Sequence, residues 1–425
     1  MQENLNCRLQ EGEFDKPLSK LYGEANLGEA HDRCSRVIAV FTETFGTEPE
    51  ALFSAPGRTE IGGNHTDYQH GRVLAGSVDL DILAAVAVNR SGLVRVQSEG
   101  YPMITVALDQ LSPRTEEKNT SAALIRGVAA RMQALGCPLQ DVGLDVCMVS
   151  NVPGGSGLSS SAAFEVLMGA IFNECFWSGK ATPVELAQIG QFAENVFFGK
   201  PSGLLDQAAC AVGGVTAMDF ADPAAPEVER IGLDLEKEGY ALCILDSHAS
   251  HADLTGEYGA VTEEMRAVSR YFGKEVLREV PEEAFCAALP KLRQAAGDRA
   301  VLRCMHFYAE DRRAAEEAEA LKKGDFEGFL ALVRQSGHSS AEYLQNVVPL
   351  GHTTDQSLMF TIALAEKLLG GKGAVRVHGG GFAGTAQAFV PLELLEEFRS
   401  GMEAVLGKHS CHVVTIRPVG AFQIV

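Results

Sequence analysis

A segment rich in glycine and serine runs from Pro153 to Ala163, between a stretch of alternating apolar residues and a stretch with helical apolar spacing. Its glycines lack side chains that would keep backbone N–H groups away from an anion. Its serines add hydroxyls at the predicted start of a helix, where unpaired N–H groups and the helix dipole favour negative charge. The sequence therefore predicts a polyphosphate-binding loop, although an ordinary glycine-rich helix start fits this segment considered alone. The residues are Gly154, Gly155, Gly157, Ser159, Ser160 and Ser161.

A second segment, Ala55 to Tyr68, combines an arginine, a histidine and an aspartate with several glycines. It reads as a connection between apolar strands, and such a density of polar groups on a loop indicates a ligand with several hydroxyls or charges. A sugar is such a ligand, because it needs donors and acceptors at fixed places. A solvated turn, in which Asp67 and His65 cap neighbouring backbone, is equally compatible with this segment alone.

Two further segments carry residues that could do chemistry. Asp206 lies just inside a predicted helix start, where the helix dipole lowers the pKa of a carboxyl group. An ionised aspartate beside an arginine could orient or deprotonate an attacking hydroxyl, although an aspartate at this position is more often only a stabilising charge. The third glycine cluster, Val377 to Thr385, lies between two apolar strands and would let the backbone approach a ligand or the first loop closely.

Composition excludes several classes of protein. The 425 residues exceed what one core usually organises, so two domains are expected. The 36 basic and 56 acidic side chains give a net charge of −20 without a basic cluster, so we expect no binding to nucleic acid. The longest apolar run, Val73 to Val88, is interrupted by Asp79 and Asp81, which excludes a membrane span. Ten cysteines without a C-x-x-C pair, and an N-terminus without an apolar leader, predict a reduced cytoplasmic protein.

The elements that must position these residues follow an α+β pattern. Helices are predicted over residues 30–45, 121–135, 183–198 and from about 204, the third of them opened by a capping box at Thr182 and Glu185. A domain boundary is expected near residue 215, ahead of a helix-rich stretch over 254–369. Strands are predicted over residues 72–75, 82–89, 94–98, 104–107, 144–149, 215–219, 241–246, 374–377, 385–390, 412–416 and 422–425.

In order and spacing, these segments resemble the three motifs of the GHMP small-molecule kinases, and residues 55–68 are similar to the sugar-binding signature of the galactokinases. The resemblance extends from Ala30 to Val425 and includes the run His251-Ala-Asp-Leu-Thr-Gly-Glu-Tyr258. It implies an N-terminal sugar- and ATP-binding domain over residues 30–215, mixed α/β with a mostly antiparallel sheet. It also implies a ferredoxin-like C-terminal domain over residues 216–425, with the active site between the two domains. Residues 1–29 would form an N-terminal extension.

The resemblance implies that ATP phosphorylates the C1 hydroxyl of galactose with the help of Mg²⁺. Asp206 would be the base or would orient the hydroxyl, and Arg58 would stabilise the transferred phosphoryl group. Ser161, or Ser160 in its place, would bind Mg²⁺ together with Glu194. The sugar-binding residues would be Asn64, His65, Asp67 and Tyr258, and the ATP-binding residues Gly154, Gly155, Ser156, Gly157, Leu158, Ser159, Ser160, Gly380 and Gly381. The sequence identifies no protein partner.

The chain departs from the family pattern at a position expected to face the sugar. Galactokinases usually read Gly-Arg-Val-Asn-Leu-Ile-Gly-Glu-His-Thr-Asp-Tyr, whereas this chain has Glu60 for the asparagine and Asn64 for the glutamate that meets the sugar near C6. Asn64 carries no charge, so galacturonate becomes an alternative substrate, unless Glu60 points into the pocket. A second departure, Ala383 within the last glycine cluster, is expected to be tolerated.

Two functions of other classes are less compatible with the sequence. A non-catalytic sugar sensor would not need to keep Asp206, Glu194 and the serine run. A dinucleotide-dependent oxidoreductase would need an acidic residue at the end of the strand that follows the first glycine loop, and none is present.

Overall fold

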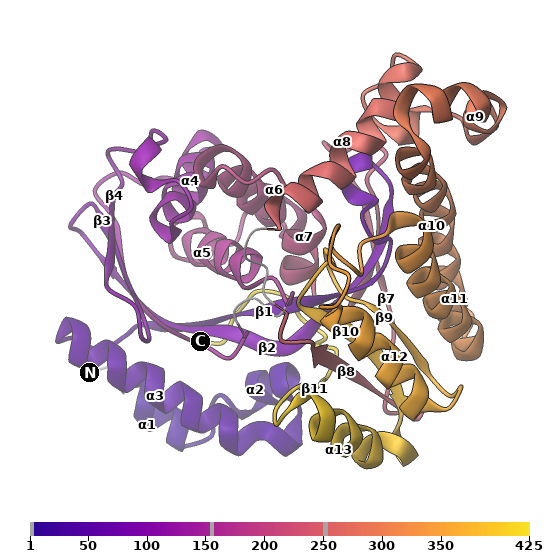
Figure 1. The fold of residues 1–425 in the computed structure, drawn as a ribbon. Coiled ribbons are helices and arrows are strands. Elements are labelled where there is room, and N and C mark those ends of the chain that lie inside the picture. Colours follow the sequence, from indigo (N-terminus) through magenta and orange to yellow (C-terminus); the bar gives the residue numbers. More distant parts are fainter. Residues whose placement is uncertain (1–3, 154–156, 250–253) are drawn as a thin grey trace.

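The computed structural model describes residues 4–153, 157–249 and 254–425, and it contains two β-sheets with helices packed around them (Figure 1). The larger sheet has eight strands in the order β12-β1-β2-β5-β3-β4, with β6 paired to β2 and β7 paired to β6. All its pairs are antiparallel except that of β3 with β5. Its strands are β1 (Ala51–Gly62), β2 (Arg72–Asn89), β3 (Leu93–Ser98), β4 (Ile104–Ala107), β5 (Gly143–Ser150), β6 (Val215–Asp219), β7 (Glu227–Ile231) and β12 (Phe422–Gln423).

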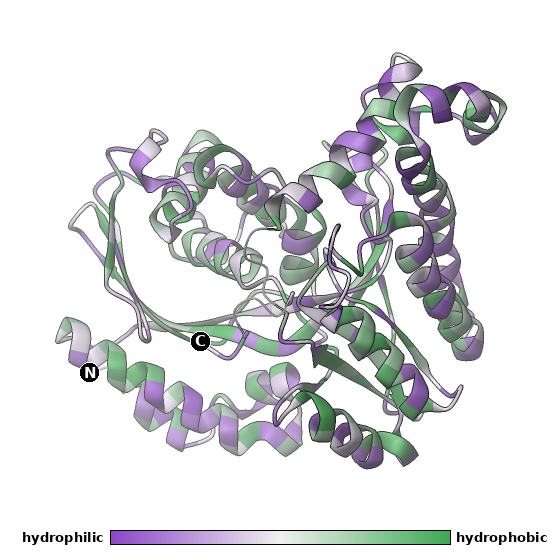
Figure 2. Ribbon diagram, viewed as in Figure 1, coloured by the Kyte–Doolittle hydropathy of each residue, from purple (hydrophilic) through white to green (hydrophobic). Residues whose placement is uncertain are grey.

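Helices cover both faces of the larger sheet (Figure 1). One face carries α4 (Ser121–Ala134), α5 (Ser160–Trp177), α6 (Pro183–Phe192) and α7 (Leu205–Val212). The other face carries α1 (Leu5–Gln10), α2 (Asp15–Tyr22) and α3 (Leu27–Phe45). In Figure 2, α5 and the strands are largely green, whereas α3 alternates between green and purple, as expected for a helix with one face on a sheet and one in water.

The smaller sheet is antiparallel throughout, in the order β11-β8-β10-β9. Alternate residues of β8 and β10 point to opposite faces, so one face packs against α11 and the other against α12 and α13. Its strands are β8 (Tyr240–Asp246), β9 (Ala374–Val377), β10 (Thr385–Pro391) and β11 (Cys411–Val414). The remaining helices are α8 (Thr255–Tyr271), α9 (Glu282–Ala296), α10 (Asp298–Lys322), α11 (Phe326–Ser339), α12 (Ser357–Leu369) and α13 (Leu395–Leu406).

The mixed α+β fold is therefore confirmed, and most predicted elements lie within a few residues of their observed bounds. The interpretation of residues 55–68 as a connection was wrong for its first half, because residues 51–62 form the fully buried strand β1. Bulges in its pairing with β2 lie between Pro56 and Arg58 and between Glu60 and Gly62. Residues 72–89 form one long strand instead of two. The π-helical turn Ala193–Phe198 ends the predicted helix over 183–198.

The two sheets do not divide at a single point in the sequence. Strands β6 and β7 follow the predicted boundary near residue 215, yet they pair with the larger sheet. Strand β12, near the C-terminus, pairs with β1 of the same sheet. The domain division at residue 215 remains a prediction. In the part of the chain that the structure describes, no helix combines the length and the apolar character needed to cross a membrane.

The N-terminal helices contact the larger sheet through Asp81 of β2, whose carboxylate is fully buried. Arg33 lies 2.6 Å from one of its oxygens and Arg417 lies 3.1 Å from the other, which also accepts a hydrogen bond from the Tyr22 hydroxyl at 2.6 Å. Burial alone would raise the pKa of Asp81, but the two guanidinium groups outweigh it and lower the pKa. The N-terminal segment is thus part of the folded body.

We expect Asp81→Asn to destabilise the fold by about 3–5 kcal/mol, because two buried arginines would lose their counter-charge. The measurement is the free energy of unfolding from urea denaturation. Asp298→Asn is the control, since Asp298 pairs with Arg293 where both side chains are about two-thirds exposed, and it should leave the unfolding midpoint unchanged. Equal effects of the two substitutions would contradict the role given to Asp81.

Candidate active site

Arg58 and Asp206, 148 residues apart in the sequence, form a partly buried ion pair where β1 meets the start of α7. Both Nε and Nη2 of Arg58 lie 2.8 Å from the same oxygen of Asp206, and Nη1 donates to the carbonyl of Gly157. The backbone N–H of Arg58 donates to the Leu158 carbonyl at 3.0 Å. The bulge in β1 beside Arg58 thus brings the sugar-signature strand against the glycine loop.

Asp206 has one carboxylate oxygen on Arg58, and the other accepts a hydrogen bond from the Ser159 hydroxyl at 2.6 Å. Burial would raise the pKa of Asp206, but the Arg58 charge and the hydrogen bonds from Arg58 and Ser159 lower it below its usual value. Asp206 is therefore ionised at neutral pH, as the sequence predicted. Its side chain remains one-third exposed, so a ligand can reach it.

The glycine loop lies where a phosphate group could meet both the helix start and Arg58. Helix α5 begins at Ser160, after Ser159 in the left-handed conformation with φ of 55°. Gly157 has φ of 72°, and a Cβ there would lie 3.2 Å from the His378 ring, so glycine suits this position for two reasons. Ser160 and Ser161 are partly exposed in the first turn of α5, whereas Leu158 is buried and can offer a ligand only its backbone. The predicted phosphate contacts Gly154, Gly155 and Ser156 lie outside the described residues.

His65 and Asp67 differ in what surrounds them. The ring of His65 is bonded on both sides, with Nδ1 2.8 Å from the Tyr68 hydroxyl and Nε2 2.9 Å from the Gly380 carbonyl. Burial lowers its pKa to about 4, so the ring is neutral, with Nε2–H donating to the carbonyl and Nδ1 accepting. Burial, followed by the charge of Asp206, raises the pKa of Asp67 to about 7.

Residues 377–385, the third glycine segment, contain three consecutive carbonyls that accept hydrogen bonds from the sugar-signature residues and from α8. Asn64 donates to Gly379 at 2.8 Å, His65 to Gly380 at 2.9 Å and the Tyr258 hydroxyl to Gly381 at 2.9 Å. A Cβ at position 380 would lie 2.7 Å from the Tyr258 ring, and one at 381 would lie 2.1 Å from the Asn346 carbonyl. These close approaches require glycine at both positions. Ala383, by contrast, is buried in an apolar cluster around α8 and α10, so the structure accommodates its methyl group.

Asn64, which was predicted to contact the sugar, is fully buried and has every amide position occupied within the protein. Its Nδ2 donates to Glu60 at 2.7 Å and to the Gly379 carbonyl, and its Oδ1 accepts from Asn346 at 2.9 Å and Ser340 at 3.1 Å. Glu60 is turned toward Asn64 and Arg376. This arrangement does not favour a sugar contact at Asn64, and the galacturonate alternative loses the argument that suggested it.

Glu194 lies in the π-helical turn Ala193–Phe198 with its carboxylate almost fully buried. It accepts hydrogen bonds from Lys200 at 3.0 Å, Ser202 at 2.5 Å and Gln207 at 2.9 Å. Gln207 also donates to Glu165 at 2.9 Å, whose pKa burial and the Glu194 charge raise to about 9. Gln207, the residue after Asp206 in α7, thus joins the carboxyl groups of Glu194 and Glu165. Glu165 was not predicted from the sequence to belong to the site.

The sequence reasoning also missed His378 and Arg376. The His378 ring lies 3.1 Å from the Thr59 hydroxyl and 2.9 Å from that of Thr385, so it links β1 to β10 beneath Gly157. Burial lowers its pKa well below the usual value, so it acts as a neutral bridge. A histidine within a glycine cluster was the available signal. The sequence carries no comparable signal for Arg376, which is a single charged residue within an apolar strand.

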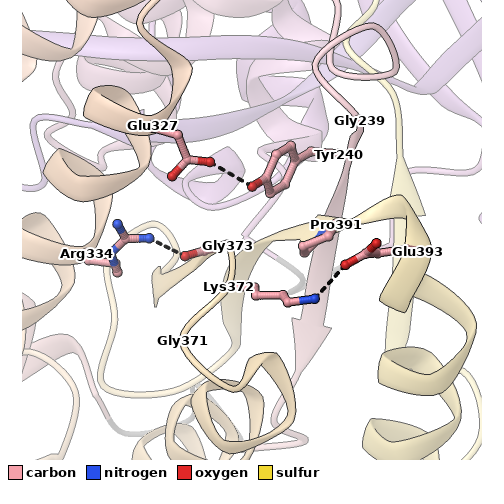
Figure 3. A pocket seen from close by; sticks show the side chains of 9 residues that line it. All are labelled: Gly239, Tyr240, Glu327, Arg334, Gly371, Lys372, Gly373, Pro391 and Glu393. Carbon is pink, nitrogen blue, oxygen red and sulfur yellow. Dashed lines mark hydrogen bonds and ion pairs between the residues drawn. The ribbon is translucent and has the colours of Figure 1, made fainter.

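A hollow between β8, β10 and α11 lies at the opposite end of the smaller sheet from the glycine segment (Figure 3). Its polar side chains have partners within the hollow: Tyr240 donates to Glu327 at 3.1 Å, and Lys372 pairs with Glu393 at 2.6 Å. Arg334 donates to the Gly373 carbonyl. No predicted site residue lines this hollow among those that the structure describes. The candidate active site is therefore the place where the three motif segments meet.

Comparisons with known proteins match two family models to this chain and find curated relatives. Residues 39–88 match the family model of the galactokinase galactose-binding signature, and residues 123–214 match that of the GHMP kinase N-terminal domain. A galactokinase from Streptomyces coelicolor is 32% identical over 370 residues, covering 87% of this chain and 90% of the relative. One from Glaesserella parasuis is 31% identical over 364 residues, covering 84% and 90%.

Two solved kinase structures are also similar to this chain. The crystal structure of Lactococcus lactis galactokinase complexed with galactose has a TM-score of 0.77 and 25% identity, covering 92% of this chain and 99% of that one. A mevalonate kinase of 13% identity, covering 88% and 98%, shares the fold with a TM-score of 0.60. The fold and the matched family models thus define a GHMP-type kinase, an enzyme that transfers a phosphoryl group to a small molecule. Within that class the chain belongs to the galactokinase family, so it is a sugar kinase.

Gly203 offers a test of whether Asp67 belongs to this site. A Cβ at Gly203 would lie 1.7 Å from Oδ2 of Asp67, so Gly203→Ala must displace that carboxylate. We expect the KM for the sugar to rise by about 10- to 100-fold, with the KM for ATP nearly unchanged. Gly232→Ala is the matched control, because nothing lies within 4 Å of its added Cβ. An unchanged sugar KM in Gly203→Ala would remove Asp67 from the proposed sugar contacts.

Proposed function

We propose that the protein transfers the γ-phosphoryl group of ATP to the C1 hydroxyl of galactose, giving α-galactose 1-phosphate and ADP. The observation that carries this proposal is the contact of Arg58 with Asp206 and Gly157, because it joins the sugar-signature strand, the helix carrying the carboxylate and the glycine loop. Galactose is the sugar named for the Lactococcus lactis relative, and the galactose-binding signature covers residues 39–88 here.

In the proposed reaction the C1 oxygen attacks the γ-phosphorus, and the bond from that phosphorus to the bridging oxygen of ADP breaks. Asp206 is ionised and partly exposed, so it would orient the hydroxyl or accept its proton. Arg58 is held in place by Asp206 and the Gly157 carbonyl, so its charge is fixed before phosphoryl transfer begins. The start of α5 would bind the ATP phosphates through its free N–H groups.

We propose that Ser161 and Glu194 hold Mg²⁺, and their chemistry fits that ion. Hydroxyl and carboxylate oxygens are ligands that Mg²⁺ accepts, and in kinases the ATP phosphates and water complete its coordination. Glu194 already faces the cation of Lys200, whose side chain is 60% exposed and able to turn away. Among the described residues no group of three or more histidine, cysteine or acidic side chains would hold a metal without such help. Bound Mg²⁺ would neutralise charge on the β- and γ-phosphates.

We also propose that the enzyme works in the cytoplasm, since its ten cysteines are all free thiols. Coupled detection of ADP release with a panel of hexoses tests the main proposal. Galactose should be the preferred substrate, galacturonate should be poor, and chelation of divalent cations should stop turnover. If folded protein releases no more ADP with any of the sugars than without sugar, the sensor alternative is favoured and the proposal is overturned.

We expect Asp206→Asn to lower kcat by about 10²–10⁴, with the KM for ATP near normal, because the proton acceptor is lost while the phosphate loop remains. Arg58→Lys should also lower kcat, since an ammonium group cannot make the two contacts of the guanidinium with Asp206. Steady-state kinetics with both substrates measures these effects. A near-normal rate for Asp206→Asn would mean that its carboxylate only stabilises the helix start.

The raised pKa of Asp67 predicts a pH dependence. Galactose hydroxyls would donate to the ionised carboxylate, so sugar binding requires loss of a proton from Asp67. Therefore kcat/KM for galactose should rise as the pH increases through about 7, the pKa of Asp67 in the free enzyme. Asp206 and His65 do not titrate in this range, since their pKa values are lowered. Asp67→Asn should have a low, flat profile between pH 6 and 8; a retained rise would assign the titration to another group.

A further inference from the structure

Asn64 binds three parts of the chain that are remote in the sequence: α10, residues 340–346 and Gly379. The side-chain amide of Asn64 makes hydrogen bonds with Glu60, Gly379, Asn346 and Ser340. Its backbone is also bound by α10. The backbone N–H of Asn64 donates to Glu310 at 3.3 Å, and its carbonyl lies 2.9 Å from Nε2 of His306. Asn64, which directly precedes the signature residue His65, is therefore held through both its side chain and its backbone.

Glu60 completes this arrangement from β1. Its Oε1 accepts both from Asn64 at 2.7 Å and from Arg376 at 2.9 Å, and the Arg376 side chain is completely buried. Arg376 also donates to the carbonyl of Ile61 in β1. Glu60 and Asn64 thus connect the larger sheet to β9, the strand that leads into the glycine segment.

We propose that Glu60 and Asn64 are a pair of positioning residues that determine the affinity for the sugar without touching it. They fix the register between the sugar-signature loop and the glycine segment, because Asn64 binds Gly379 while its neighbour His65 binds Gly380. Asn346 reinforces that register by donating to both Asn64 and the Gly380 carbonyl. The inference rests on the proposed function insofar as the loop binds a sugar.

The charges around Glu60 and Asn64 determine which substitutions would keep their contacts. Asn64→Glu would place a second carboxylate against Glu60 and would remove the donor to the Gly379 carbonyl. Glu60→Asn would leave Arg376 without its carboxylate partner. Exchanging the two residues keeps one carboxylate and one amide in the contact, so the buried charge is unchanged. The donors Asn346 and Ser340 would still serve a carboxylate at position 64.

The experiment is a double-mutant cycle with Glu60→Asn, Asn64→Glu and the exchanged pair, each checked for folding by its melting temperature. We expect each single substitution to raise the KM for galactose at least about tenfold, with the KM for ATP within about threefold of wild type. The exchanged pair should raise the KM for galactose by less than the product of the two single effects, because one carboxylate again lies among the donors. Its KM should stay above that of the wild type, because the donor to the Gly379 carbonyl is still absent. A lower KM in Asn64→Glu alone would mean that position 64 faces the sugar, and additive effects in the pair would likewise overturn the proposal.

Milder variants keep the test decisive if a single substitution prevents folding. Ser340→Ala removes one donor to Asn64 and should raise the KM for galactose about two- to fivefold. Ser269→Ala is the matched control, because Ser269 is equally buried but bonds only to carbonyls of Arg266 and Glu275. Equal KM values in the two variants would contradict the proposal. Wild-type turnover of galactose tests the proposed function separately, and the KM ratios can be measured with whichever sugar the wild type phosphorylates.

Discussion

The ion pair between Arg58 and Asp206 sets the requirements that the rest of the site meets. Removing two charges from water is costly unless each receives further hydrogen bonds. Here Ser159 supplies one to Asp206, and the Gly157 carbonyl accepts one from Arg58, so both compensating groups come from the glycine loop. The loop therefore has to lie against β1, and α7 has to begin where it does. A fixed charge pair and a glycine loop that packs closely against it follow from the same contacts.

The third glycine segment, residues 377–385, extends this arrangement to the residues of the galactose-binding signature. Its carbonyls at 379, 380 and 381 are bound by Asn64, His65 and Tyr258, from two different parts of the chain. On the other side, the neutral ring of His378 bridges β1 and β10 beside Gly157. The signature loop and the glycine loop are thus held by one backbone segment, whose glycines allow it to pass between them. A shift of that segment would move both loops.

Strand β1 explains why local reasoning failed where it did. Its polar residues and glycines are typical of a loop, yet all twelve of its residues are buried. The polar groups are acceptable there because partners more than 100 residues away satisfy them: Asp206 for Arg58, Arg376 for Glu60 and His378 for Thr59. A sequence pattern cannot tell a solvated polar residue from a buried, satisfied one, because the difference lies in the partner.

The α+β class, most strands and helices, and the three glycine-containing segments could be predicted from the sequence, because apolar periodicity and glycine placement are local properties. Asp206 at a helix start was predicted as well, and the low pKa predicted there agrees with the structure. Three features emerge only in the folded chain: Asn64 is buried, Glu60 faces Arg376, and β6, β7 and β12 complete one sheet. These features depend on charges and strand edges meeting across hundreds of residues. Which groups meet is fixed by the packing of the whole chain, and the spacing within any one motif does not contain it.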